Sequence, residues 1–185
     1  VQTCALPIYA PTNPQELELP TVEFKLDGKT IVSYEGETIL KAAKRHGIDI
    51  PHLCFKDGYR PDGNCRACVV EINGERTLAP SCCRSATPGM EVKANSERAI
   101  KSQKLVLEML LSDMPDEGFK WVGDSKEQEQ KNQHGELSAW AARMNVTVRP
   151  ELKALRRDQV GADLSHPAMA VNLDACIQCN RCVRA

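Results

Sequence analysis

The stretch PHLCFKDGYRPDGNCRACVVEINGERTLAPSCCR, residues 51–84, decides the fold of this chain. It contains four thiols at a defined spacing: Cys54, ten residues, Cys65, two residues, Cys68, thirteen residues and Cys82. Two glycines and an asparagine lie between the first two cysteines. Such residues tolerate the left-handed backbone that points successive N–H groups inward, toward sulfur. Four thiols presented in this way suit a [2Fe–2S] cluster held by four thiolates.

The residues around the last two of these cysteines predict short strands. Residues 69–72 are apolar and mostly β-branched, which favours a strand, and Asn73-Gly74 is a type I′ hairpin signal. We therefore expect a return strand over residues 76–78. Because adjacent residues of an extended chain project differently, only one of Cys82 and Cys83 can readily join the other thiols.

A structural zinc site is the alternative occupant, because CxxC pairs are common zinc ligands. Zinc ribbons usually carry two CxxC pairs, whereas the first and last cysteines here stand alone. Disulfides are less favoured. Nothing in the sequence looks like a signal peptide, and its nine cysteines point to a reducing cytoplasm where thiolates stay available as ligands.

The residues before this stretch predict a β-hairpin and a helix. Residues 21–26 alternate apolar and polar, Asp27-Gly28 turns, and residues 30–34 return. A helix is expected over residues 37–46, ended by Gly47. A last strand over residues 90–93 completes the β-grasp order of plant-type ferredoxins.

Residues 21–93 resemble the [2Fe–2S] domain that opens the large iron–sulfur subunits of complex I, iron-only hydrogenases and NAD-dependent formate dehydrogenases. The wording CFKDGYRPDGNCRACVVEINGERTLAPSCCR is most similar to the formate dehydrogenase alpha subunit. The resemblance implies Cys54, Cys65, Cys68 and Cys82 as ligands. It is also the reason to prefer Cys82 over Cys83, since spacing alone does not separate them, and Cys83 is therefore expected to point away from the other thiols.

A helix is predicted over residues 97–112, capped by Asn95 or Ser96, with five inward-facing residues: Ile100, Leu105, Val106, Met109 and Leu110. In the complex I relatives this helix leads into a cluster held by one histidine and three cysteines. Residues 112–145 contain no cysteine and only His134. We therefore expect no cluster there, His134 in an exposed loop or helix cap, and a helix over residues 136–144 that faces inward through Leu137, Trp140, Ala141 and Met144.

The end of the chain carries a second cysteine set, Cys176, Cys179 and Cys182, each separated by two residues. Three thiolates at this spacing suit one [4Fe–4S] cluster, with the fourth ligand outside this sequence. VNLDACIQCNRCVRA also resembles the ferredoxin-like domain of the same subunits; zinc is a weak competitor. Before it we expect a short strand over residues 146–148 and a helix over residues 151–157.

Composition excludes two function classes. A net charge of −1 leaves no basic surplus for nucleic acid, and no apolar stretch approaches the ~20 residues of a membrane span. With 26% charged and 4% aromatic residues, metal must help to hold a small core together.

The predicted fold class is α+β: a β-grasp [2Fe–2S] ferredoxin-like domain, a helical segment, and the start of a ferredoxin-like [4Fe–4S] domain. Val1–Ile8, with Cys4, reads as a translated adapter, so we expect a fragment trimmed at both ends. The expected divisions are an artefact or disordered tail (1–20), the [2Fe–2S] domain (21–97), a helical region equivalent to the histidine–cysteine-ligated domain without its cysteines (98–145), a linker (146–165) and a truncated [4Fe–4S] domain (166–185).

No catalytic residue is visible, so the predicted role is electron relay. The resemblance implies a cytoplasmic molybdenum or tungsten formate dehydrogenase that passes electrons toward NAD through a flavin/NAD-binding partner subunit. Its molybdopterin-type cofactor would lie in the missing C-terminal part. The alternatives are an iron–sulfur subunit of complex I or of an NAD-linked hydrogenase and, in another class, a zinc-stabilised structural module.

Overall fold

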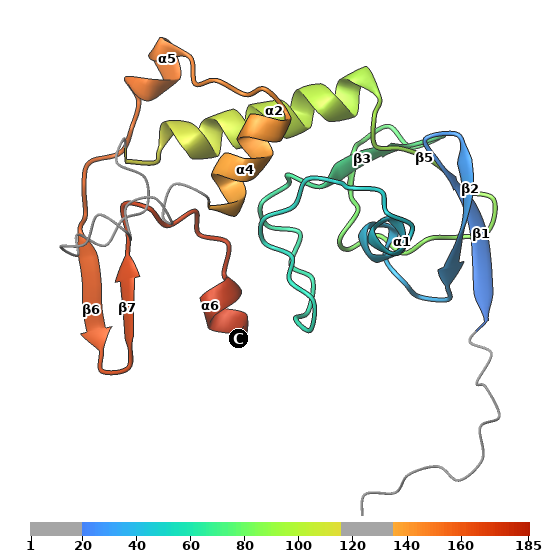
Figure 1. Cartoon of the computed structure of the whole chain (residues 1–185), viewed down its shortest axis with the longest axis horizontal. Helices are drawn as coiled ribbons and strands as arrows, with labels where there is room; N and C mark the ends of the chain where they lie inside the picture. Colours follow the sequence, from blue (N-terminus) through green and yellow to red (C-terminus); the bar gives the residue numbers. More distant parts are fainter. Residues whose placement is uncertain (1–19, 116–134) are drawn as a thin grey trace, which may run out of the picture.

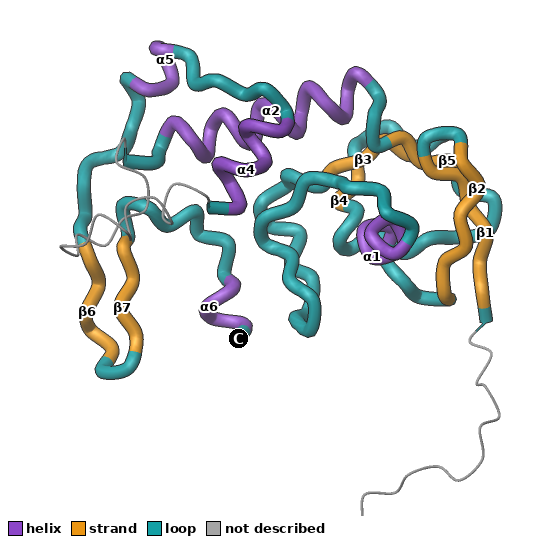
Figure 2. Tube along the Cα trace, in the orientation of Figure 1, coloured by secondary structure: helices purple, strands orange, loops and turns teal. Residues whose placement is uncertain are grey.

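The computed structural model describes residues 20–115 and 135–185 of the chain. His134 and the predicted tail up to residue 19 lie outside the described residues. Figure 1 shows a sheet with helix α1 (Ile39–Arg45) beside it at one end and the hairpin of β6 (Ala162–His166) and β7 (Met169–Asn172) at the other. Helix α2 (Glu97–Ser112) runs between them. Figure 2, in the same orientation, shows long loops between α1 and β3.

The sheet has five strands in the order β2-β1-β5-β3-β4. The N-terminal hairpin pairs antiparallel, β1 pairs parallel with β5, and β5 pairs antiparallel with β3. The strands are β1 (Thr21–Leu26), β2 (Lys29–Tyr34), β3 (Val69–Ile72), β4 (Ala79–Pro80) and β5 (Glu91–Lys93). A mixed sheet with a helix packed on it confirms the predicted α+β, ferredoxin-like arrangement of this part.

The first turn forms as its residues dictate. Asp27 and Gly28 both have positive φ (49° and 82°), which is the requirement of a type I′ turn. The Asp27 carboxylate then accepts hydrogen bonds from the amides of Ala94 and Asn95, so the hairpin tip also fixes the chain that leaves β5.

The predicted type I′ turn at Asn73-Gly74 is wrong. Only Gly74 has positive φ (83°), and Glu75 N donates to Ile72 O at 3.0 Å, the pattern of a type II turn. Asn73 stays paired with β5, because its amide donates to Glu91 O at 2.9 Å. The return strand therefore starts later than expected, at Ala79 instead of residue 76.

Helix α1 (Ile39–Arg45) begins after Thr38, whose side chain accepts from Lys41 N, and Gly47 follows its end with a φ of 71°. It lies two residues inside the predicted range at its start. Its apolar face closes the main core over the sheet, which includes Phe24, Leu26, Ile31, Ile39, Leu40, Ile50, Phe55, Val70 and Val92.

Helix α2 (Glu97–Ser112) has the predicted bounds, and Ser96 is its cap, accepting from Ala99 N. The predicted inward face is confirmed in part. Val106 and Leu110 are partly buried against a second apolar cluster, whereas Leu105 and Met109 are 45% and 56% exposed. The buried positions are Ala99, Gln103, Leu107 and Glu108. The helix is rotated toward polar partners, since Gln103 Nε2 donates to Val69 O at 2.8 Å and Glu108 binds Arg149.

Helix α4 (Glu136–Arg143) confirms the predicted inward face. Leu137 and Ala141 are buried, and Trp140 and Met144 pack against a second apolar cluster around Leu53, Ala67 and Leu107. This cluster joins α4 and α2 to the loop that precedes β3.

Two predictions for the following segment are wrong. Residues 146–148 form no strand. Val146 N donates to Ala141 O at the end of α4, and Arg149 N donates to the Glu108 carboxylate, so the backbone at both ends of this segment is bonded to helices and not to a strand. Helix α5 (Pro150–Lys153) ends before the expected residue 157. Arg157 N donates to the Asp113 carboxylate instead of a helical carbonyl.

The last described segment contains an antiparallel hairpin, β6 (Ala162–His166) with β7 (Met169–Asn172), and then the short helix α6 (Arg181–Arg184). The hairpin was not predicted. The expected boundary between residues 165 and 166 falls inside it. No helix within the described residues is long and apolar enough to cross a membrane.

Candidate metal centre

The structure brings together the four cysteines singled out in residues 51–84. Cys54, Cys68 and Cys82 are buried and Cys65 is partly buried. The Cys54 sulfur is hydrogen-bonded with the sulfurs of Cys65 and Cys82, and the Cys82 sulfur with that of Cys68. These contacts form an open chain of pairs. In the part of the chain that the structure describes, no three His, Cys, Asp or Glu side chains close around a single-ion position.

Backbone amides of the Cys54 loop, residues 54–68, also point at sulfur. Cys54 N donates to Cys65 Sγ at 3.4 Å, and the amides of Asn64 and Cys65 interact with the Cys54 sulfur. Left-handed residues make this curl possible, because Gly63 has a φ of 63° and Arg66 a φ of 57°. The loop therefore has the inward amides that the glycine and asparagine content predicted.

The four thiols titrate as a group. Hydrogen bonds from Cys65 and then Cys82 hold the pKa of the Cys54 thiol far below its ordinary value. Donation to Cys54 raises the pKa values of Cys65 and Cys82, with burial adding to both. The hydrogen bond from Cys82 lowers the pKa of Cys68 to about 7. Sulfurs packed this closely can all be thiolates only around a cationic centre, which an iron–sulfur core supplies. The donor set fits such a core.

Contrary to the expectation, the Cys83 side chain does not point away from the other thiols. It is exposed, yet its Sγ lies 3.6 Å from Cys82 Sγ. The cause is local: the amides of Cys83 and Arg84 both donate to Pro80 O, so residues 81–83 form a turn and their side chains do not alternate as in a strand. Burial and the contacts with Cys54 and Cys68 separate Cys82 from its neighbour.

The second cysteine set lies on one loop. Cys176 and Cys179 are partly buried and Cys182 is exposed. Gln178 N donates to Cys176 Sγ at 3.4 Å, and Gln178 and Asn180 have positive φ (54° and 58°). Among the described contacts these three sulfurs are not bonded to one another.

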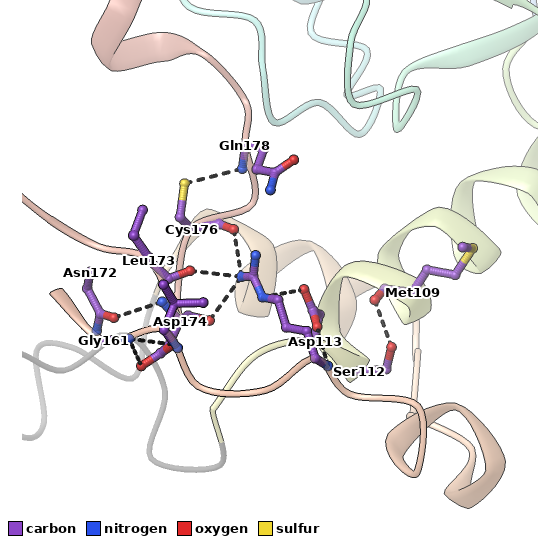
Figure 3. Close-up of polar contacts among 11 residues, drawn as sticks. Met109, Ser112, Asp113, Gly161, Asn172, Leu173, Asp174, Cys176 and Gln178 are labelled. Carbon is purple, nitrogen blue, oxygen red and sulfur yellow. Dashed lines mark hydrogen bonds and ion pairs between the residues drawn. The ribbon is translucent and has the colours of Figure 1, made fainter. Parts of the chain in front are cut away.

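Arg157 binds the residues at the start of this loop. Arg157 Nη2 donates to the carbonyl oxygens of Leu173 (2.9 Å), Asp174 (3.2 Å) and Cys176 (3.0 Å), while its Nε lies 2.9 Å from the Asp113 carboxylate at the end of α2. Figure 3 shows Asp113 across from Leu173, Asp174 and Cys176, the residues to which Arg157 is bonded. The second cysteine loop is therefore tied to α2.

The two cysteine sets are also neighbours, which the sequence analysis missed. Asn64 Nδ2 donates to Gln178 O at 2.8 Å, and Ile177 packs on the apolar cluster around Leu53 and Ala67. Arg181 and Arg184 of α6 donate to carbonyl oxygens of the Cys54 loop. The signal was visible as RCVR, two arginines flanking the last cysteine, but charges are ordinarily interpreted as a solvated face.

A known family model matches the first part of the chain. Residues 20–97 match the family model described as a 2Fe-2S iron–sulfur cluster binding domain. This match covers the sheet and all four cysteines of the buried set. Residues 20–97 are thus similar to iron–sulfur domains of the [2Fe–2S] class.

Longer similarities extend over most of the chain. It is 38% identical over 166 residues to the NADP-reducing hydrogenase subunit HndD of Solidesulfovibrio fructosivorans, covering 85% of this chain and 26% of that protein. It is 32% identical over 172 residues to the mitochondrial NADH-ubiquinone oxidoreductase 78 kDa subunit of Candida albicans, covering 90% of this chain and 22% of that protein. The chain therefore spans about a quarter of these relatives.

A solved structure shares the fold. A chain in the crystal structure of an NAD⁺-reducing [NiFe]-hydrogenase in the H₂-reduced state superimposes with a TM-score of 0.70 at 32% identity. The match covers 89% of this chain and 65% of the hydrogenase chain. These relatives are parts of oxidoreductases.

Proposed function

We propose that this chain is an electron-transfer module of an NAD(P)-linked oxidoreductase of the hydrogenase or complex I type. The observation that carries the proposal is the packed set of four cysteines, three of them buried, inside a [2Fe–2S] domain. A [2Fe–2S] cluster supplies one-electron transfer. Four protein thiolates leave no open coordination position for a substrate, so relay fits this site better than catalysis.

The proposed ligands are Cys54, Cys65, Cys68 and Cys82. Three roles of the surrounding residues follow from the contacts. The amides of the Cys54 loop stabilise thiolate charge, the core around Phe55 and Ile50 excludes water, and the turn at residues 81–83 places Cys82 inward.

Cys176, Cys179 and Cys182 are proposed to bind a [4Fe–4S] cluster together with a fourth ligand outside this sequence. Support comes from their spacing and from the left-handed residues Gln178 and Asn180, which turn the loop around its sulfurs.

The terminal reaction is proposed from the relatives. The hydrogenase and NADH-ubiquinone oxidoreductase subunits described above favour hydrogen or NADH chemistry over the formate chemistry expected from the sequence wording. Their names mention no molybdopterin cofactor. We propose that the chain exchanges electrons with a flavin/NAD-binding partner subunit in the cytoplasm.

Absorption spectroscopy of the anaerobically purified protein tests the iron–sulfur assignment. Broad visible bands that bleach with dithionite are expected. A colourless protein that contains about one zinc per chain would overturn the proposal in favour of a structural zinc module.

A further inference from the structure

Arg184 of helix α6 contacts both cysteine sets. Arg184 Nη2 donates to the carbonyl oxygens of Cys54 (2.6 Å) and Cys179 (3.0 Å), and its Nη1 donates to Arg60 O (2.6 Å). One guanidinium thus joins the residue that begins the Cys54 loop to the middle cysteine of the second set.

Two further residues, Arg181 and Asn64, make contacts in the same region. Arg181 Nη2 donates to Phe55 O at 2.7 Å, and its Nη1 pairs with Glu136 Oε2 at 2.6 Å, with the arginine side chain only 22% exposed. Asn64 Nδ2 reaches Gln178 O at 2.8 Å. The second cysteine segment, residues 176–182, is therefore held to the Cys54 loop at Gln178 and at Arg181.

The chemistry of Arg184 suits this task. A guanidinium is a rigid fork of five donors, so it can serve several carbonyl oxygens with little loss of side-chain freedom. Among the described residues no carboxylate forms an ion pair with Arg184, and its hydrogen bonds go to carbonyl oxygens. Its positive charge therefore lies between the two sets without an acidic partner there.

We infer that Arg184, assisted by Arg181, is a positioning residue that holds the two cysteine sets in one fixed arrangement and places a positive charge between them. The inference rests on the proposed electron-transfer function. One site loses one electron and the other gains it, with no bond made or broken and no proton moved. A fixed arrangement keeps the separation between the two sites constant, and the charge favours the more negative, reduced state of both.

Two variants separate position from charge in the complete protein. Arg184→Lys keeps the charge but cannot span three carbonyl oxygens, and Arg184→Ala loses both. Arg98→Lys is the matched control, because Arg98 Nη2 donates to Arg76 O at 2.7 Å, a loop contact that involves neither cysteine set. EPR of the dithionite-reduced protein measures the magnetic interaction between the two reduced clusters, and redox titration measures their midpoint potentials.

The wild type and Arg98→Lys are expected to show broadening of the [2Fe–2S] signal by its neighbour, and both Arg184 variants to lose it. Both midpoint potentials fall in Arg184→Ala, while Arg184→Lys keeps them nearer to the wild-type values. Unchanged broadening in both Arg184 variants overturns the positioning role, and unchanged potentials in Arg184→Ala overturn the charge role.

Hydrogen exchange tests the docking without relying on metal. Loss of one charge-assisted hydrogen bond is expected to speed exchange in residues 176–184 by about tenfold in Arg184→Lys, with residues 21–34 unchanged as the fold control. Equal exchange in the wild type and both Arg184 variants overturns the inference. A wild-type protein without clusters overturns the proposed function instead, and hydrogen exchange then decides the docking by itself.

Discussion

Gly63 is the position where the Cys54 loop tolerates a side chain least. Its φ is 63°, and a Cβ built there would lie 2.9 Å from Cys83 Sγ. The left-handed backbone costs a non-glycine residue roughly 1–2 kcal/mol. Moving the Cys83 side chain off its rotamer costs on the order of 1 kcal/mol more. Gly63→Ala should therefore lower the free energy of unfolding by about 2–3 kcal/mol.

Gly58 provides the matched control within the same loop. Its φ is 88°, but nothing lies within 4 Å of a Cβ built there. Gly58→Ala should cost only the backbone part, about 1–2 kcal/mol. Urea denaturation of the two variants and of Gly63→Ala combined with Cys83→Ala measures the difference. The combined variant should recover the cost of the contact. Equal losses for Gly58→Ala and Gly63→Ala, or no recovery on removing the Cys83 sulfur, would refute the close approach of Cys83 to this loop.

Three further predictions each concern one residue or one adjacent pair. Cys83→Ser should leave the EPR signal of the reduced [2Fe–2S] site intact and Cys82→Ser should abolish it; the opposite pair of results would move the ligand to Cys83. Gln103→Leu should lower the free energy of unfolding by about 1–3 kcal/mol in urea denaturation, because Val69 O loses its buried donor; an unchanged stability would contradict that role. Arg66→Ala should lower the midpoint potential of the same site in protein-film voltammetry while Arg66→Lys preserves it, because Arg66 lies between Cys65 and Cys68 and a positive charge there favours the more negative, reduced state. A rise in the alanine variant would count against this charge effect.

The parts of the fold that could be predicted from the sequence are those determined by residues close together in the chain. Asp27-Gly28 needs only its own two residues to form a type I′ turn, and Ser96 needs only the amide three residues later to cap α2. The spacing of Cys54, Cys65 and Cys68 is likewise contained in one loop. Each of these features depends only on residues close together in the sequence, so it can be predicted from the sequence alone.

The wrong predictions depend on residues far along the chain. The buried face of α2 is chosen by Gln103 and Glu108, whose partners lie 34 and 41 positions away. The apolar periodicity of the helix contains no information about such distant polar partners, and it therefore predicts Leu105 and Met109 as buried. The bridge made by Arg184 spans 130 positions to Cys54, and no local pattern distinguishes it from a solvated arginine.

The central claim is that the buried set of four cysteines holds a two-iron cluster. EPR spin quantification of the dithionite-reduced complete protein, with Cys176, Cys179 and Cys182 all changed to Ser, tests it most directly. Any cluster held outside this chain is subtracted by the same measurement on a protein that also carries Cys54→Ser. A difference of about one unpaired spin, accompanied by about two irons, is expected. No difference between the two proteins would contradict the assignment.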